Sequence, residues 1–185
     1  RTSASRISSF ILSPSSFCPQ QPRCSQLLSA WQPFKFAVAA SKTSTSFPAA
    51  TAPLANAVAN VLNVPFVIVR RDLKITEGST VSVNYVSGSS GDRIEKMFLS
   101  KRSLKAGSRV LIVDDFLKGG GTINGMISLL TEFDSELAGV AVFADNAQEE
   151  REKQFDYKSL LKVTNIDVKN QAIDVEVGNI FDEDK

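Results

Sequence analysis

The sequence predicts an α/β fold in which a parallel sheet is flanked by helices. Continuous apolar runs of strand length lie within residues 64–69, 109–115 and 137–145. Between them are segments whose apolar residues recur with the period of an amphipathic helix. Strands that are apolar on both faces are typical of parallel sheets, because helices cover both faces of such a sheet.

The first predicted elements are a helix, a strand and a hairpin. A helical stripe starts at Leu54 and ends before Asn63 and Pro65, and VPFVIV (64–69) follows as a buried strand. TVSVNYV (80–86) alternates as a strand does, SGSSGD (87–92) is typical of a flexible turn, and RIEKMFLS (93–100) resumes the pattern. We therefore expect a hairpin, or hood, with a mobile tip.

The second half continues the alternation of strands and helices. RVLIVDD (109–115) predicts a buried strand that ends in two acids. A helix with one apolar face follows, and then the strand LAGVAVFAD (137–145). A polar helical turn near 149–153 and two late strands near 159–163 and 172–177 complete the expected domain. The helix face consists of Ile123, Met126, Ile127, Leu130 and Phe133.

Composition divides the chain into two unlike parts. With 185 residues, of which 43% are hydrophobic, the chain can fill one domain core. Residues 1–71 carry 7 Lys and Arg and no acid, whereas 72–185 carry 14 basic and 20 acidic residues. We expect the folded domain to span 53–185 and no strand to precede its first helix.

Residues 1–52 show no sustained apolar period. A transit peptide, a disordered tail and a segment translated out of frame all fit this composition. The abrupt start of protein-like sequence at Pro53 favours a frame error or the junction of a fragment. Cys18 and Cys24 are too few for a metal site, and we expect idle thiols. No apolar run approaches the ~18 residues of a membrane span, so we expect a cytoplasmic protein without membrane contact.

The stretch VLIVDDFLKGGGTING (110–125) combines features of two kinds of site. Glycines let backbone N–H groups approach an anion, and Thr122 could cap the following helix, so this half suits a phosphate. Adjacent carboxylates would repel a phosphate unless they accept hydrogen bonds from sugar hydroxyls or share a divalent cation. A ribose 5-phosphate would satisfy both halves.

This motif resembles the binding site for 5-phosphoribosyl 1-pyrophosphate (PRPP) in type I phosphoribosyltransferases. The resemblance extends over about residues 53–185 to the effector domain of Gram-positive purine operon repressors, through RRDLKITEGSTVSVNYVSGSS (70–90), the stretch 101–133 and DVEVGNIF (174–181). It implies a type I phosphoribosyltransferase-like fold that senses PRPP, homodimers, and DNA binding only through a winged-helix domain that this chain lacks.

The resemblance assigns roles to individual residues. Asp114 and Asp115 match the ribose-binding acids, and the 5-phosphate loop matches Lys118, Gly119, Gly120, Gly121 and Thr122. At the position that matches Lys118, catalytic members usually have a small residue. At the position that matches Gly119, they usually have Thr or Ser. In the family the pyrophosphate loop follows the first core strand. In this chain the segment SFPAATAPLA (46–55), which contains neither Lys nor Gly, stands in place of that loop. The first core strand could therefore be missing as well.

Five further residues are candidates for pyrophosphate or hood contacts. Arg70 and Arg71 could meet pyrophosphate or a purine edge, or could simply be solvated at a strand end. Lys101 and Arg102 could close on the PRPP phosphates or form a solvated basic pair. Tyr85 could pack on a ligand, although we expect it to fill the sheet.

Two functions from different classes follow from these patterns. In the first, the domain binds PRPP as a regulatory signal and has no catalytic residues. In the second, it is an active purine phosphoribosyltransferase that uses Mg²⁺. The unrecognisable pyrophosphate loop and the Lys118-Gly119 pair favour the first. Whether the site binds a metal ion, such as Mg²⁺ shared by the two acids, stays open.

Overall fold

The computed structural model describes residues 36–40, 51–73, 78–87, 93–147 and 155–184. Three expectations therefore lie outside the described residues: most of the hairpin tip at 87–92, the polar helical turn at 149–153, and the segment before residue 51 that replaces the pyrophosphate loop. The expectations for Cys18, Cys24 and most of residues 1–52 also lie outside the described residues.

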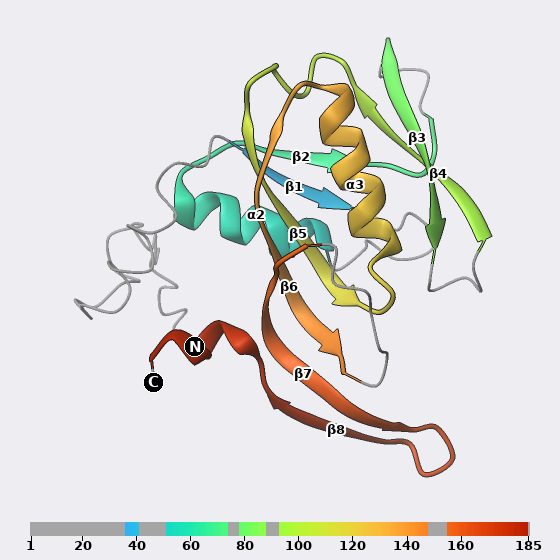
Figure 1. Ribbon diagram of the computed structural model, residues 1–185, viewed down its shortest axis with the longest axis vertical. Helices are drawn as coiled ribbons and strands as arrows, with labels where there is room; N and C mark the ends of the chain where they lie inside the picture. The colour runs from blue at the N-terminus through green and yellow to red at the C-terminus, as the bar shows by residue number, and fades with distance from the viewer. Residues whose placement is uncertain (1–35, 41–50, 74–77, 88–92, 148–154, 185) are drawn as a thin grey trace, which may run out of the picture. The chain divides into compact units, whose positions relative to one another are not determined.

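A six-stranded sheet forms the centre of the domain (Figure 1). The strand order is β2-β1-β5-β6-β7-β8. All neighbours run parallel except β7 and β8, which are antiparallel. The bounds of the strands are Phe36–Ala40 for β1, Phe66–Val69 for β2, Arg109–Leu117 for β5, Glu136–Asn146 for β6, Lys158–Asp167 for β7 and Ala172–Val177 for β8.

The strand β1 corrects one expectation from the sequence. We expected no strand before the first helix, but Phe36–Ala40 lies between β2 and β5. Its residue Val38 pairs with Val67 on one side and Ile112 on the other. The run FAVAA is apolar and of strand length, yet its partners are distant in sequence and its flanks lack any periodic pattern. The first core strand is therefore present.

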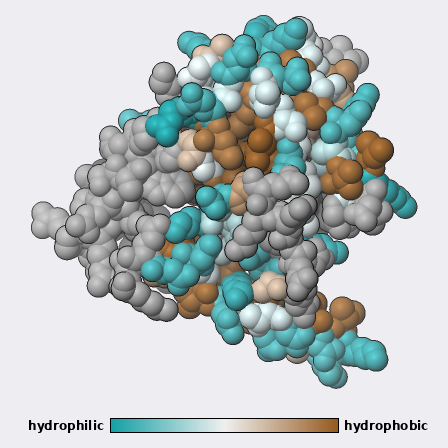
Figure 2. Space-filling view, in the orientation of Figure 1, coloured by the Kyte–Doolittle hydropathy of each residue, from teal (hydrophilic) through white to brown (hydrophobic). Residues whose placement is uncertain are grey.

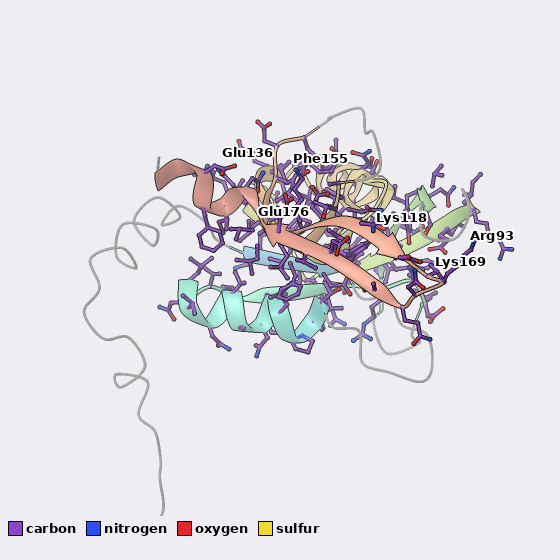
Figure 3. All side chains as sticks on the ribbon, turned by 90° about the horizontal axis from the view of Figure 1, so that it is seen from below. Arg93, Lys118, Glu136, Phe155, Lys169 and Glu176 are labelled. Carbon is purple, nitrogen blue, oxygen red and sulfur yellow. The ribbon has the colours of Figure 1, made fainter. Side chains whose placement is uncertain are left out.

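Two helices cover opposite faces of the sheet, which Figure 3 shows from the side. Helix α2, Thr51–Leu62, packs on β1, β2 and β5. Helix α3, Gly121–Glu132, packs on the other face and against β3. The predicted face of α3 is confirmed, because Ile123, Met126 and Leu130 are buried. Both faces of β5 are thus covered, as its continuous apolar run predicts.

The hairpin predicted at 80–100 is confirmed. Strands β3 (Thr80–Ser87) and β4 (Arg93–Ser100) form a separate antiparallel sheet. Its inner face contributes Tyr85, Met97 and Leu99 to the core. A backbone bridge between Arg70 and Phe98, with N···O distances of 3.0 and 2.7 Å, joins this sheet to the chain that leaves β2. The hairpin is therefore anchored at the carboxyl end of β2.

The late strands are also confirmed, and β8 forms an exposed edge. The 3₁₀ helix η4, Asn179–Asp184, follows β8, and its Asn179 carboxamide accepts the backbone N–H of Ser159 at 2.7 Å. Apolar side chains on the β7–β8 hairpin reach the surface, where Figure 2 shows brown patches at the lower right. Neither α2 nor α3 covers this antiparallel edge, which explains the exposure.

Candidate functional site

The predicted site lies at the carboxyl edge of the sheet, where β5 leads into α3. Asp114 and Asp115 lie inside β5 and not after it, because the strand continues to Leu117. Ligands of open parallel sheets bind beyond this edge. The register also brings the end of β2 to the same level. Ala39 pairs with both Ile68 and Val113, so Val69 and Asp114 are level and two strands apart, about 10 Å.

Asp114 is buried, with 2% of its surface exposed. Its Oδ1 accepts the Thr51 hydroxyl at 3.3 Å and the backbone N–H of Asp115 at 3.0 Å. Thr51 is the first residue of α2, so the carboxylate joins β5 to that helix. Charge-assisted bonds of this kind stabilise the ionised carboxylate and fix its orientation. Asp114 is thus a preorganised acceptor.

Asp115 is more accessible than Asp114. It is partly exposed, and its Oδ1 accepts the backbone N–H of Phe116 at 2.8 Å. Each aspartate therefore accepts the amide of the next residue, which holds the two carboxylates in a set arrangement despite their like charge. This arrangement suits a pair of hydroxyl donors, such as a ribose diol.

The loop from Lys118 to Gly120 bends the chain from β5 into α3. Gly120 has φ 74° and ψ −7°, a left-handed conformation that favours glycine. The expectation that Thr122 caps the helix is wrong: the N-cap is Gly120, which has no side chain to cap with, and Thr122 lies in the first turn. The N–H groups of that turn have no acceptor within the helix. They can therefore bind an anion.

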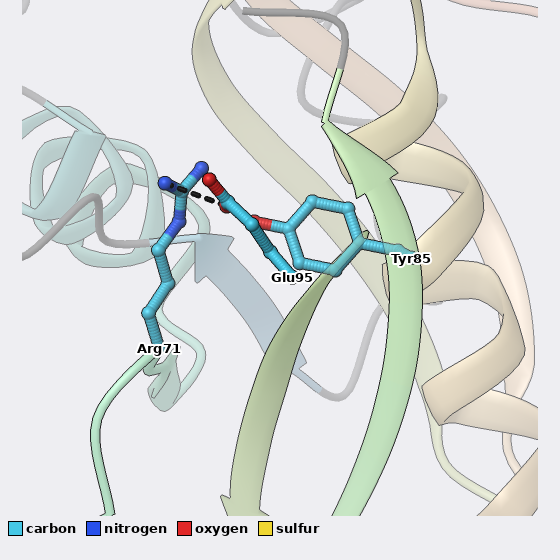
Figure 4. Close-up of polar contacts among 3 residues, drawn as sticks. All are labelled: Arg71, Tyr85 and Glu95. Atoms are coloured by element: carbon cyan, nitrogen blue, oxygen red, sulfur yellow. Dashed lines mark hydrogen bonds and ion pairs between the residues drawn. The ribbon is translucent and has the colours of Figure 1, made fainter. Parts of the chain in front are cut away.

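Arg71, Tyr85 and Glu95 form a polar cluster where the hairpin meets the end of β2 (Figure 4). The Arg71 Nη1 lies 2.7 Å from Glu95 Oε2, and the Tyr85 hydroxyl donates to the same oxygen at 2.6 Å. The Arg71 guanidinium also lies 5.8 Å from the centre of the Tyr85 ring. Burial, together with the bond to Glu95, raises the pKa of Tyr85, which stays protonated as a donor.

Glu95 is a residue of this site that the sequence did not reveal. It stands in an alternating strand, where a lone glutamate is usually solvated. The signal lies in the pairing register, in which Glu95 is the cross-strand partner of Tyr85. Tyr85 is buried on the inner face, as we expected, and this places Glu95 there too.

The other candidate basic residues occupy different positions. Arg70 forms the backbone bridge to Phe98 and is partly exposed. Lys101 and Arg102 are exposed in the turn after β4, and the Arg102 guanidinium lies against Gly78. No contact given for the described residues joins Lys101 or Arg102 to the acids or to the loop. Their phosphate role stays a prediction.

A second group that the sequence did not single out flanks the loop on the β6 side. Asp145 is buried at the end of β6, pairs in register with Leu117, and accepts the Tyr157 hydroxyl at 2.7 Å. The Phe155 ring lies 3.4 Å from where a Cβ on Gly120 would stand. The sequence signal that could have revealed Asp145 is its place as an acid at the end of an apolar strand. These residues close one side of the loop.

Within the part of the chain that the structure describes, no three His, Cys, Asp or Glu side chains lie close enough together to hold a metal ion. Mg²⁺ usually uses only one or two carboxylates together with ligand phosphates, and Asp114 and Asp115 could serve in that way. None of the helices there is long and apolar enough to cross a membrane.

Comparison with known proteins shows that the chain is similar to part of several transcriptional regulators and to transferases. It is 98% identical over 133 residues to the "probable purine biosynthesis transcriptional regulator" of Streptococcus pneumoniae serotype 4, covering 72% of this chain and 48% of that protein. It is 55% identical over 129 residues to the purine biosynthesis transcriptional repressor of Bacillus subtilis, covering 70% and 45%. The chain thus spans about half the length of these curated relatives.

The fold is also found in a solved structure. Adenine phosphoribosyltransferase from Thermoanaerobacter pseudethanolicus superposes with a TM-score of 0.60 at 24% identity, covering 75% of this chain and 77% of that one. The predicted fold class and the resemblance to purine biosynthesis regulators are confirmed. The family model described as phosphoribosyl transferase domain matches residues 48–178. The chain belongs to the phosphoribosyl transferase domain family.

Proposed function

We propose that this domain binds PRPP as a signal that controls transcription of purine biosynthesis genes. One observation carries the proposal: three features follow one another at the carboxyl edge of the sheet. They are two carboxylates of β5 fixed by backbone amides, a glycine loop, and the start of α3. Carboxylates accept from the ribose hydroxyls, while the loop and helix amides bind the 5-phosphate. Regulation then requires that PRPP binds two states of the larger protein with different affinity.

Binding without turnover is favoured by the loop residues. Lys118 and Gly119 stand where catalytic members usually have a small residue and a hydroxyl residue. Lys118 supplies a cation for a phosphate, while Gly119 removes a side-chain donor. The domain therefore retains affinity for an anion and has lost one group that would orient it for reaction.

In the longer protein, we expect the domain to act as a homodimer. DNA would be bound through a winged-helix domain, and PRPP binding would change the affinity of that domain for operator DNA. The homodimer and the winged-helix domain are implied by the family resemblance, and the regulatory role is supported by the names of the regulator relatives, of which the chain spans about half.

The alternative is an active purine phosphoribosyltransferase. It is favoured by the match to a family named for the transferase activity. The acid pair and the loop would then orient PRPP, and Mg²⁺ would neutralise charge on the departing pyrophosphate. The reaction breaks the bond between ribose C1 and the pyrophosphate oxygen and forms one from C1 to a purine nitrogen. This function requires a base pocket in addition to the PRPP site.

A turnover assay separates the two functions. The chain is mixed with PRPP and Mg²⁺, and then with adenine, guanine, hypoxanthine or xanthine in turn, and released pyrophosphate is measured. We expect no release above a matched sample without protein. Base-dependent release that Asp114→Asn abolishes would instead establish the transferase and would contradict a purely regulatory site.

A further inference from the structure

The Arg71 guanidinium is held from one side only. Glu95 accepts from Nη1 at 2.7 Å, while Nη2 is a buried donor without a hydrogen-bond partner in the part of the chain described. Buried donors are normally paired, so an unpaired one marks a place where a further acceptor is expected. A guanidinium has five N–H groups and can serve two acceptors at once. Nη2 is closed to solvent in this structure, so Arg71 can hold Glu95 and a second anionic oxygen together only when the guanidinium shifts to open Nη2 to the ligand.

Arg71 also lies at the edge where the proposed ligand binds. Because Val69 and Asp114 are level in the register, the carboxyl end of β2, two residues before Arg71, lies at the same edge of the sheet as Asp114. Two strand spacings, about 10 Å, separate these strands. The 5-phosphate loop leaves the end of β5. A ligand seated on the acids with its 5-phosphate in the loop could thus direct its other anionic end toward β2.

Glu95 is itself held in place by its surroundings. Its Oε2 accepts the Tyr85 hydroxyl at 2.6 Å as well as the Arg71 N–H. Tyr85 has little freedom, because its Cβ and ring pack closely against Gly125 of α3. Arg71 is consequently positioned through a chain of contacts that runs from α3 through the hairpin to the end of β2. Figure 4 shows the carboxylate between the other two side chains.

We propose that Glu95 is a positioning residue, which holds Arg71 so that its Nη2 receives an oxygen of the pyrophosphate group of PRPP. The proposal rests on PRPP being the ligand. It adds a determinant of selectivity, since ribose 5-phosphate has no pyrophosphate group and would gain nothing from Arg71. A competing role for Glu95 makes the opposite prediction. If its carboxylate occupied the ligand's place on Arg71, removing its charge would tighten PRPP binding.

The experiment compares the affinities of PRPP and ribose 5-phosphate by calorimetric titration. The proteins are the unsubstituted chain, Glu95→Gln, Arg71→Ala, and the double variant. Glu95→Gln keeps the shape and an acceptor oxygen but removes the charge that orients the guanidinium. Tyr85→Phe is a second variant that removes only one hydroxyl. The matched control is Glu136→Gln, an exposed residue at the start of β6, which Figure 3 shows at the opposite end of the sheet from Lys118.

We expect Glu95→Gln to weaken PRPP binding about tenfold, because the charge that orients the guanidinium is lost and a neutral acceptor holds it less strongly. Ribose 5-phosphate binding should change less than about twofold in the same variant. The double variant should bind PRPP no more weakly than Arg71→Ala, because residues that act through one another are not additive. Tyr85→Phe should show a smaller loss in the same direction.

Equal weakening of both ligands, additive losses, or tighter PRPP binding in Glu95→Gln would each overturn the positioning role. Each of these outcomes would leave the proposed function intact, because the unsubstituted chain would still bind PRPP. If the unsubstituted chain binds neither ligand, the proposed function and this inference both fail.

Discussion

Replacing Asp114 and Asp115 together by asparagine is expected to weaken PRPP binding at least about 100-fold, since each carboxylate supplies a charge-assisted bond to a ribose hydroxyl. The free energy of unfolding should change little. Asparagine keeps the shape and an oxygen that can accept from Thr51 and from the neighbouring amides, and the change removes a buried charge. Calorimetric titration and thermal unfolding of the same samples measure the two effects.

Asp174→Asn provides the matched control for that variant. Asp174 lies on the exposed edge strand β8, and its carboxylate accepts from the Asn165 side-chain amide on the neighbouring strand at 3.1 Å. It should bind PRPP as the unsubstituted chain does. Equal affinity in the double variant would contradict the assignment of the ribose to β5, whereas a large loss of thermal stability would show that the acids serve the fold instead.

Gly125→Ala is expected to reduce the free energy of unfolding by about 1–3 kcal/mol, as overpacking of a core does. A Cβ at this position would stand 2.7 Å from Tyr85 Cβ and 2.7 Å from Met97 Cε. The gain of about 1 kcal/mol from replacing glycine in a helix is too small to offset this clash. Urea unfolding measures the change. Because the clash would shift the hairpin that carries Glu95, PRPP affinity should also fall.

The control for Gly125→Ala is Gly139, a partly buried glycine of strand β6 with room for a methyl group. A Cβ on Gly139 would lie 3.7 Å from the nearest atom, Leu111 Cδ1, which is ordinary contact. Gly139→Ala should therefore be neutral or stabilise by up to about 1 kcal/mol through the unfolded state. Similar destabilisation by both changes would indicate a general intolerance of alanine and would remove the special role of the α3–hairpin contact.

The sequence revealed most elements whose patterns are local. The continuous run of β5, the apolar face of α3 and the alternation of the β3–β4 hairpin each encode burial within a few residues. The acid pair and the glycine loop could be assigned as a site because their chemistry is consecutive in the chain. The strand order could not be read, because β1 inserts between β2 and β5 through pairing between distant residues.

Two features depended on geometry that a linear pattern does not carry. Thr122 looked like a helix cap, but the left-handed conformation of Gly120 starts α3 without one. Glu95 resembled a solvated charge, and only its register with Tyr85 and its distance to Arg71 reveal a role. Both depend on backbone conformation and on contacts between separate elements. The resemblance to purine repressors identified the ribose acids and the loop but gave no hint of Glu95.

The central claim, that the β5 acids and the α3 loop bind PRPP, is tested most directly by calorimetric titration of PRPP into this chain with and without Mg²⁺. We expect saturable binding at one site per chain, and competition by ribose 5-phosphate, because the acids and the loop recognise that part of the ligand. Absence of saturable binding in both conditions, or binding that ribose 5-phosphate does not compete, would contradict the claim.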